Sequence, residues 1–212
     1  MNDKNAFEVV RQFERRVAEY AGSKYAVAVD SCTNALFLSC MYMNIKGHEV
    51  TLPKRTYVSV PQSVIHAGGK VKFKDIKWEG TYKLNPFPIV DGAKRFTKGM
   101  YEKGTFHCLS FHMKKILDIG RGGAILTDNE EAVDWFKQAR FDGRHEVPLY
   151  HDEFKILGWN MYMTPEQAGR GLWKMMGLPE FNEDLNIKYL QKPTDDKNNN
   201  SYFNFVGYKI KC

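Results

Sequence analysis

An amphipathic pattern opens the chain. Apolar side chains recur at three- and four-residue steps from Phe7 to Tyr20, and Gly22 follows soon after. This spacing puts the apolar side chains on one face of a helix, and glycine commonly takes the left-handed conformation that ends one. The pattern predicts a helix over residues 7–21 that stops at Gly22.

Short apolar runs alternate with further helical patterns as far as Gly177. The runs are rich in β-branched residues and predict strands over residues 25–29, 50–52, 71–74, 88–91, 105–111 and 124–127. Helical patterns cover residues 34–43, 128–141 and 164–177. Strands that alternate with helices are typical of an α/β domain with a largely parallel sheet.

The start of the last helix is the best marked. Thr164 is a favourable N-cap, proline follows at the first helical position, and Gln167 completes a capping box. The chain beyond it differs in character. Residues 191–201 are polar and low in complexity, which predicts a linker, and residues 202–211 alternate as a strand does.

Composition sets the class of protein. A chain of 212 residues with 43% apolar and 26% charged residues suits one globular domain with a small appendage. No apolar run is long enough to span a bilayer, and the first ten residues lack the basic-then-apolar pattern of a signal peptide. We therefore expect a cytoplasmic protein that does not enter a membrane.

The charge and the cysteine content argue against two kinds of ligand, nucleic acids and metal ions. The 31 basic and 25 acidic residues give a net charge of +6, but the two signs are interspersed, which argues against a nucleic-acid surface. The four cysteines form no CxxC pair, and the six histidines are dispersed, so no metal site is expected. Reduced, buried thiols are the simplest interpretation.

Polar side chains of types that bind ligands or take part in catalysis follow three predicted strands. The first strand ends in Asp30 and Ser31, the fourth in Asp91, and the fifth in Ser110, which a Lys114–Lys115 pair follows. Ligands of open α/β sheets bind beyond the carboxyl ends of strands. Taken singly, each group also has an ordinary explanation as a helix cap, a turn residue or surface charge.

In this order, however, the segments resemble the DegT/DnrJ/StrS family of pyridoxal-phosphate-dependent sugar aminotransferases. The matching segments are SCTNAL, GHEVTLPKRTYVSVPQSVIHAGGKVKFKDI, IVDGAKRF, LSFHMKKILDIGRGGAILTDNEE, ARFDG and LGWNMYMTPEQAGRGL. They cover most of residues 7–176. The resemblance implies the α/β large domain of the fold-type-I transferases, with a mostly parallel central sheet flanked by helices, and pyridoxal 5'-phosphate as cofactor.

The resemblance also implies roles for residues. Lys115 stands at the Schiff-base lysine, and Lys114 is its neighbour without a role. Asp91 matches the aspartate that pairs with the cofactor's pyridine nitrogen, and Ser110 matches a serine that binds its phosphate. Such a carboxylate keeps the ring nitrogen protonated, and the lysine must lose its own proton to act as general base and acid.

Four further positions belong to the implied cofactor site. Cys32 and Thr33 match the turn that binds phosphate, and Tyr57 stands where an aromatic residue stacks on the ring. Asn160 matches an asparagine that reaches the cofactor phosphate of the neighbouring subunit. The resemblance therefore implies a homodimer with shared active sites.

The chain also departs from the family pattern. It is short: between residues 76 and 88 a strand–helix unit before the aspartate is missing, and the small C-terminal domain is strongly reduced. We divide the chain into a cofactor-binding large domain, residues 1–177, and a remnant of the small domain, residues 178–212. Single departures from the usual residues occur at Cys32, Val90, Lys94 and Tyr162.

The expected function is transfer of an amino group, from glutamate, onto a nucleotide-linked keto-sugar, as in polysaccharide biosynthesis. The alternative is a degenerate member that binds pyridoxal phosphate, or only dimerises, without turnover. A lyase or dehydratase on the same cofactor is a third hypothesis, which the lysine at position 115, where the known dehydratase type has histidine, argues against.

Overall fold

A computed structural model describes residues 7–187 of the chain. The helices are α1 (Glu8–Ala21), α2 (Cys32–Tyr42), α3 (Ser59–His66), α4 (Glu130–Ala139) and α5 (Pro165–Met175), with a short 3-10 turn, η1 (Leu149–His151). The strands are β1 (Tyr25–Val29), β2 (Glu49–Pro53), β3 (Lys70–Lys74), β4 (Tyr82–Lys83), β5 (Ile89–Asp91), β6 (Phe106–Ser110) and β7 (Gly123–Thr127).

Local sequence signals set the ends of several helices as predicted. Gly22 ends α1 with φ +82°, and its backbone N–H donates to the Ala18 carbonyl. Asn129 caps α4, because its side chain accepts from the N–H of Ala132. Thr164 and Gln167 form the expected capping box of α5. None of the described helices is long and apolar enough to cross a membrane.

The main sheet is mixed rather than largely parallel. Its strand order is β1-β7-β6-β5-β4. Only β5 and β6 pair in parallel; the β1–β7, β6–β7 and β4–β5 pairs are antiparallel. The reason lies between β6 and β7, where residues 111–122 fold back as a loop without a helix. A parallel return would need a crossover, usually through a helix.

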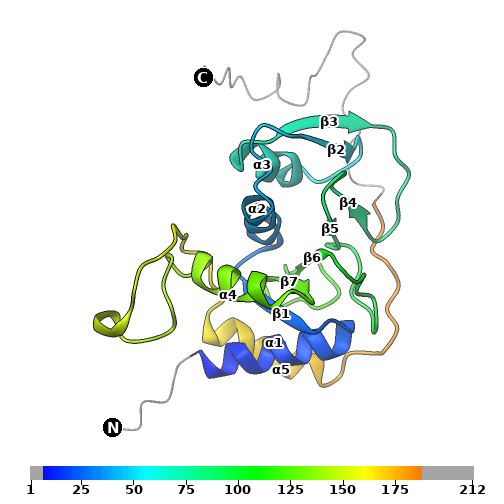
Figure 1. The fold of residues 1–212 in the computed structure, drawn as a ribbon. Coiled ribbons are helices and arrows are strands. Elements are labelled where there is room, and N and C mark those ends of the chain that lie inside the picture. The colour runs from blue at the N-terminus through cyan, green and yellow to red at the C-terminus, as the bar shows by residue number, and fades with distance from the viewer. Residues whose placement is uncertain (1–6, 188–212) are drawn as a thin grey trace.

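Four strands of the main sheet, β1, β7, β6 and β5, are buried on both faces. In β1, Ala26 and Ala28 face one core and Val27 and Val29 face the other, as the two-residue period of a strand requires. One core also contains side chains of α1 and α5, and the other those of α2, α3 and α4. Figure 1 shows α1 and α5 side by side along one face of the sheet.

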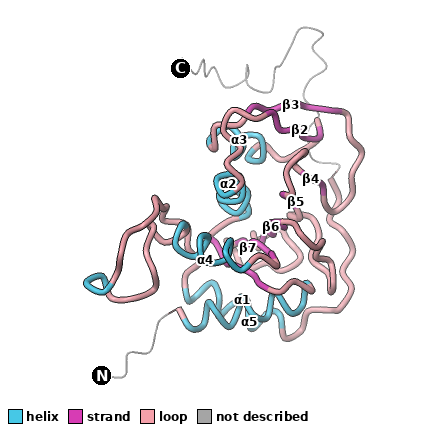
Figure 2. The backbone as a smooth tube through the Cα atoms, in the orientation of Figure 1, coloured by secondary structure: helices cyan, strands magenta, loops and turns pink. Residues whose placement is uncertain are grey.

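A second, two-stranded sheet lies beside the first. β2 and β3 pair in parallel around α3, a helix that the sequence patterns did not predict. Thr51 of β2 joins this sheet to the main one: its N–H donates to the Asn85 carbonyl at 2.7 Å and its carbonyl accepts from the Asn85 N–H at 3.2 Å. Figure 2 shows this pair of strands at the end of the molecule opposite α1.

Residues 176–187, the described part of the segment after α5, contain no helix or strand and contact the loop that follows β5. The Lys98 N–H donates to the Glu180 carbonyl at 2.8 Å, and the Leu185 N–H donates to the Lys94 carbonyl at 2.9 Å. Arg95 and Asp184 form a two-pronged ion pair. The predicted linker at 191–201 and strand at 202–211 lie outside the described residues, so the domain boundary at residue 177 stays a prediction.

Candidate functional site

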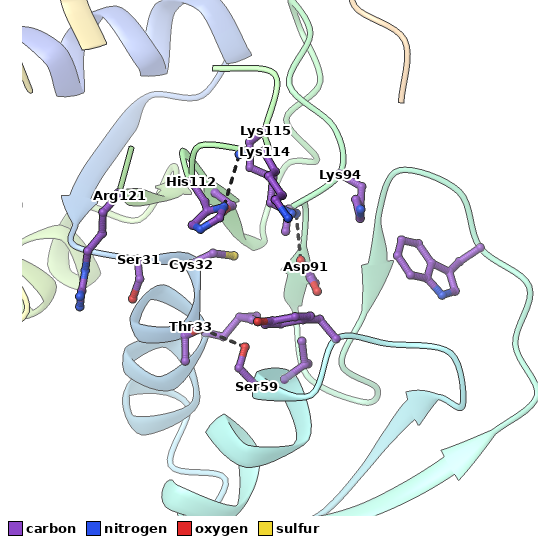
Figure 3. A pocket seen from close by; sticks show the side chains of 17 residues that line it. Ser31, Cys32, Thr33, Ser59, Asp91, Lys94, His112, Lys114, Lys115 and Arg121 are labelled. Atoms are coloured by element: carbon purple, nitrogen blue, oxygen red, sulfur yellow. Dashed lines mark hydrogen bonds between the residues drawn. The ribbon is translucent and has the colours of Figure 1, made fainter. Parts of the chain in front are cut away.

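A pocket of about 450 Å³ opens between the ends of β1, β5 and β6 and the start of α3. Six of the seven residues predicted for the site line it, namely Cys32, Thr33, Tyr57, Asp91, Ser110 and Lys115. Figure 3 shows Lys115 and Lys94 approaching Asp91 from one side, with Thr33 and Ser59 on the other. The fold therefore brings together four segments, residues 32–33, 57–59, 91–94 and 110–115, which are spread over about 80 residues of the sequence.

Lys115 lies in the β6–β7 loop. Backbone bonds from Phe111 to Gly122 at 2.9 Å and from Met113 to Gly120 at 3.0 Å close this loop. Gly120 has φ +94°, a conformation that other residues rarely adopt. The Lys115 amine is half-buried, and burial lowers its pKa, although the nearby Cys32 and Asp91 act in the opposite direction. A lysine with a lowered pKa is a better nucleophile near neutral pH.

Asp91 ends β5 and is 6% exposed. Its Oδ1 accepts from the Ala93 N–H at 2.9 Å, and its Oδ2 accepts from the Tyr82 hydroxyl at 2.7 Å. Burial raises the pKa of the carboxyl, whereas these two hydrogen bonds and the charges of Lys115 and Lys94 lower it. The pocket thus holds a buried acceptor that suits a protonated ring nitrogen.

The first turn of α2 lines the pocket. The Ser31 side chain caps it by accepting from the Asn34 N–H at 3.2 Å, and the Thr33 hydroxyl donates to Ser59 Oγ at 2.9 Å. Unpaired amides and the helix dipole make such a turn attractive to anions. A Cβ at Gly123 would come within 2.6 Å of the Ser31 carbonyl carbon and the Cys32 nitrogen, so only glycine lets β7 support this turn.

Besides Lys115, the lysine and arginine side chains of Lys94, Lys114 and Arg121 line the pocket. Lys94, one of the departures from the family pattern, is buried; burial and the Lys115 charge lower its pKa to about 8. Its amine donates to the Asn186 carbonyl at 3.3 Å. Arg121 lies at the mouth and pairs with Asp30 Oδ2 at 2.6 Å. The cluster favours an anionic ligand.

The structure also shows where the remaining predicted positions lie. Asn160 is exposed and outside the pocket, where its amide donates to Asp142 Oδ2 at 3.1 Å. Tyr57 is 59% exposed at the pocket wall. Tyr162, where the family pattern has arginine, packs its ring against Phe7 and Phe141.

Among the residues that the sequence analysis did not assign to the site are Ser59, Trp78 and Arg121, which line the pocket, and Tyr82, which donates a hydrogen bond to Asp91. Ser59 begins a helix without a side-chain cap, and Tyr82 belongs to a two-residue strand. Neither element has a recognisable local signal. Only the Gly-Arg-Gly-Gly segment at residues 120–123 could have indicated that Arg121 lies close to the site.

The sequence profile of the DegT/DnrJ/EryC1/StrS aminotransferase family matches residues 4–101 and 90–192. The chain belongs to this family. The two matched segments overlap near the point where the sequence analysis predicts a missing strand–helix unit.

Characterised relatives share about a quarter of their residues with the chain. The UDP-4-amino-4,6-dideoxy-N-acetyl-beta-L-altrosamine transaminase of Campylobacter jejuni is 25% identical over 214 residues, which cover 80% of this chain and 57% of the relative. The GDP-perosamine synthase of Caulobacter vibrioides is 26% identical, with 80% and 57% covered. This chain therefore spans little more than half the length of these enzymes.

The Campylobacter alignment is longer than the part of this chain that it covers. The relative therefore has residues within the aligned region that this chain lacks. This agrees with the prediction of an internal deletion.

Solved structures share the fold. A putative PLP-dependent aminotransferase from Bacillus cereus superimposes with a TM-score of 0.68 at 20% identity, over 81% of this chain and 59% of that one. Helicobacter pylori PseC, an aminotransferase of pseudaminic acid biosynthesis, gives a TM-score of 0.65 at 17% identity, over 84% and 59%. The fold is that of the fold-type-I transferases, as the resemblance implied.

Proposed function

We propose that this chain is an aminotransferase that uses pyridoxal 5'-phosphate to move an amino group onto a nucleotide-linked keto-sugar. The observation that carries the proposal is the meeting of Lys115, Asp91 and the first turn of α2 in one pocket. An amine of lowered pKa, a buried carboxylate and an anion-binding turn are the three groups that this cofactor needs.

The residues present fit the cofactor. The pocket volume of about 450 Å³ lies within the range of small-molecule sites. Lys115 would hold the cofactor's aldehyde carbon, and Asp91 would hold a proton on its ring nitrogen. The hydroxyls of Thr33, Ser59 and Ser110, together with the α2 amides, would bind the phosphate. Tyr57 would cover one face of the ring.

When bound, pyridoxal phosphate supplies a ring that accepts electrons from the substrate carbon that carries the amine. The chain's own residues do the rest. The Lys115 Nζ would hold the cofactor, and as a neutral amine it would act as the general base and acid that moves a proton to and from the substrate carbon that carries the amine. Burial, which lowers the pKa of Lys115, keeps more of this amine neutral and able to accept a proton.

The substrates are inferred from the relatives. The Campylobacter and Caulobacter enzymes are named for UDP- and GDP-linked sugars, and a Bacillus subtilis relative is named a 3-oxo-glucose-6-phosphate:glutamate aminotransferase. A keto-sugar with a phosphate linkage and glutamate as donor follow by analogy, and the Lys94 and Arg121 charges suit such an anionic acceptor. We further propose a cytoplasmic homodimer in which Asn160 reaches the partner's cofactor.

An absorption spectrum tests the proposal. The purified protein is incubated with pyridoxal phosphate, desalted, and then given glutamate. We expect a retained visible band that moves on adding glutamate to the band of pyridoxamine phosphate. A retained band that does not respond to glutamate would favour the alternative, cofactor binding without turnover. Loss of the band on desalting would overturn cofactor binding altogether.

The alternative has one observation in its favour. Residues that the Campylobacter and Caulobacter relatives possess within the aligned region are absent here. Against it stand the buried Asp91 and the lowered pKa of Lys115, which a purely structural protein has no reason to keep.

A further inference from the structure

We propose that Tyr82 is a positioning residue for the Asp91 carboxylate, and that the short strand β4 holds it against the cofactor site. The inference rests on the proposed function, because it gives Asp91 its partner for orientation. Tyr82 lies within residues 76–88, where the sequence analysis predicts that a strand–helix unit of the family is missing. The shortened segment therefore contributes directly to the site.

Strand register brings the two side chains together. Tyr82 is the antiparallel partner of Asp91 in the β4–β5 pair, so both side chains point to the same face of the sheet. The Tyr82 hydroxyl donates to Asp91 Oδ2 at 2.7 Å. Because the Ala93 N–H holds Oδ1, each carboxylate oxygen has one fixed donor, and the plane of the carboxylate is determined.

The hydrogen bond has a defined direction. A carboxylate can only accept, so the ionised Asp91 requires Tyr82 to donate its single hydroxyl proton. The buried Thr56 hydroxyl also bonds to the Tyr82 oxygen, and it must then be the donor in that contact. The result is a row of hydrogen bonds from Thr56 through Tyr82 to Asp91. Both hydroxyls thereby stabilise the negative charge of the Asp91 carboxylate.

Neighbouring contacts hold the tyrosine in place. Tyr82 is 7% exposed, and the Trp78 ring packs against it with the centroids 4.6 Å apart. The Trp78 indole N–H donates to the Arg55 carbonyl at 2.8 Å, directly before Thr56 in the chain. The segment that carries Tyr82 is thus attached at two adjacent points to the loop that follows β2.

The arrangement leaves the carboxylate able to serve a ligand. A carboxylate has about four acceptor positions, of which Tyr82 and Ala93 occupy two. Asp91 lines the pocket, so a protonated ring nitrogen is a suitable further donor. Five titratable groups interact with Asp91 electrostatically or by a hydrogen bond: Tyr82, Cys32, Cys108, Lys94 and Lys115. Of these groups, Tyr82 donates a hydrogen bond to Asp91 Oδ2 at 2.7 Å.

The competing explanation is that Tyr82 merely fills the core, and a set of variants separates the two. Tyr82→Phe keeps the ring and removes the hydroxyl. Tyr20→Phe is the matched control, because Tyr20 is also buried and its hydroxyl donates to the Pro179 carbonyl at 2.6 Å, away from the pocket. Thr56→Val removes only the outer hydroxyl of the row of hydrogen bonds, and it serves as second variant if Tyr82→Phe does not fold.

Two readouts are measured, neither of which is activity. The first is the pKa of the Asp91 carboxyl in the full chain without cofactor, followed by carbon NMR and assigned with Asp91→Asn. We expect it to rise by about one to two units in Tyr82→Phe, less in Thr56→Val, and not in Tyr20→Phe. The second is the dissociation constant for pyridoxal phosphate, which we expect to increase about tenfold in Tyr82→Phe only.

The outcomes distinguish this inference from the proposed function. If the unmodified chain binds pyridoxal phosphate and Tyr82→Phe changes neither readout, Tyr82 is a core residue and the inference is overturned, while the proposed function stands. If the unmodified chain does not bind pyridoxal phosphate, the proposed function fails and the positioning role fails with it. A shift in both readouts that Tyr20→Phe does not reproduce supports the inference.

Discussion

The pocket is built by two regions of unlike construction. The strands of the main sheet and the segments that directly follow them contribute Asp91, Ser110, Lys115 and the first turn of α2, the groups proposed to hold the cofactor. The region of residues 49–84, with the small β2–β3 sheet, contributes Tyr57, Ser59 and Trp78 to the lining, and its Tyr82 donates a hydrogen bond to Asp91. In that region β3 alternates between exposed and half-buried residues.

This difference indicates that the two regions contribute different kinds of group to the pocket. Groups that form bonds or hold charge need fixed geometry, and the buried strands of the main sheet provide it. The smaller region adds aromatic surface and hydroxyls, which tolerate more movement. Tyr82 is the exception, since β4 joins it to the main sheet by register. The predictions below test whether the main sheet carries most of the chemistry.

The largest effect is expected at Lys115. Lys115→Ala removes both the point of attachment for the cofactor and the group that moves the proton, so we expect transamination to fall by about 10⁴-fold. Borohydride reduction followed by mass spectrometry should find no covalent adduct. The control is Lys114→Ala, which alters the exposed neighbouring lysine. An adduct that persists in Lys115→Ala and disappears in Lys114→Ala would reverse the assignment.

A smaller loss is expected from Asp91→Asn. The amide has nearly the same shape but no charge to hold a proton on the ring nitrogen, so the rate should fall about 100- to 1,000-fold. Steady-state kinetics measure it, with Asp134→Asn on the exposed side of α4 as control. Undiminished transamination would mean that Asp91 does not act on the cofactor.

Asp91→Asn should also change how the free energy of unfolding depends on pH. Burial raises the folded-state pKa of Asp91 above 3.8, so the folded chain binds more protons than the unfolded one as pH rises through 3.8 toward the folded-state pKa. Stability from this group therefore falls with rising pH in that window. Asp91→Asn lacks this term, so its free energy of unfolding without cofactor should gain on that of the unmodified chain between pH 4 and pH 7, as urea titrations at the two pH values would show.

The smallest effect is expected in the second region. Tyr57 is exposed at the pocket wall, and an aromatic contact contributes about 0.5–1.5 kcal/mol. Tyr57→Ala should weaken pyridoxal phosphate binding by about 2- to 10-fold, measured by fluorescence titration. Val58→Ala, at the adjacent exposed residue, should leave binding unchanged. If Tyr57→Ala lowered the transamination rate as much as Asp91→Asn does, the two regions would not differ in their contribution to the chemistry.

Local signals in the sequence were strong where one residue decides a local event. Gly22 ends α1 because it adopts a left-handed conformation, and Thr164 with Gln167 begins α5 by satisfying free amides. The beginning of α2 was predicted at residue 34, two residues late, because Ser31 is the cap. The helix α3 was missed, since Val58 provides no cap and Pro61 breaks the pattern.

The sequence alone determined the α/β class and six of the seven strands that the structure describes, and it predicted the residues of the cofactor motif, because periodicity, caps and motif order are local properties of the chain. Tertiary structure decided that the sheet is mixed, since strand direction depends on how residues 111–122 return. It also decided that Tyr82 meets Asp91, because a two-residue strand has no pattern of its own and only its register across the sheet determines its partner.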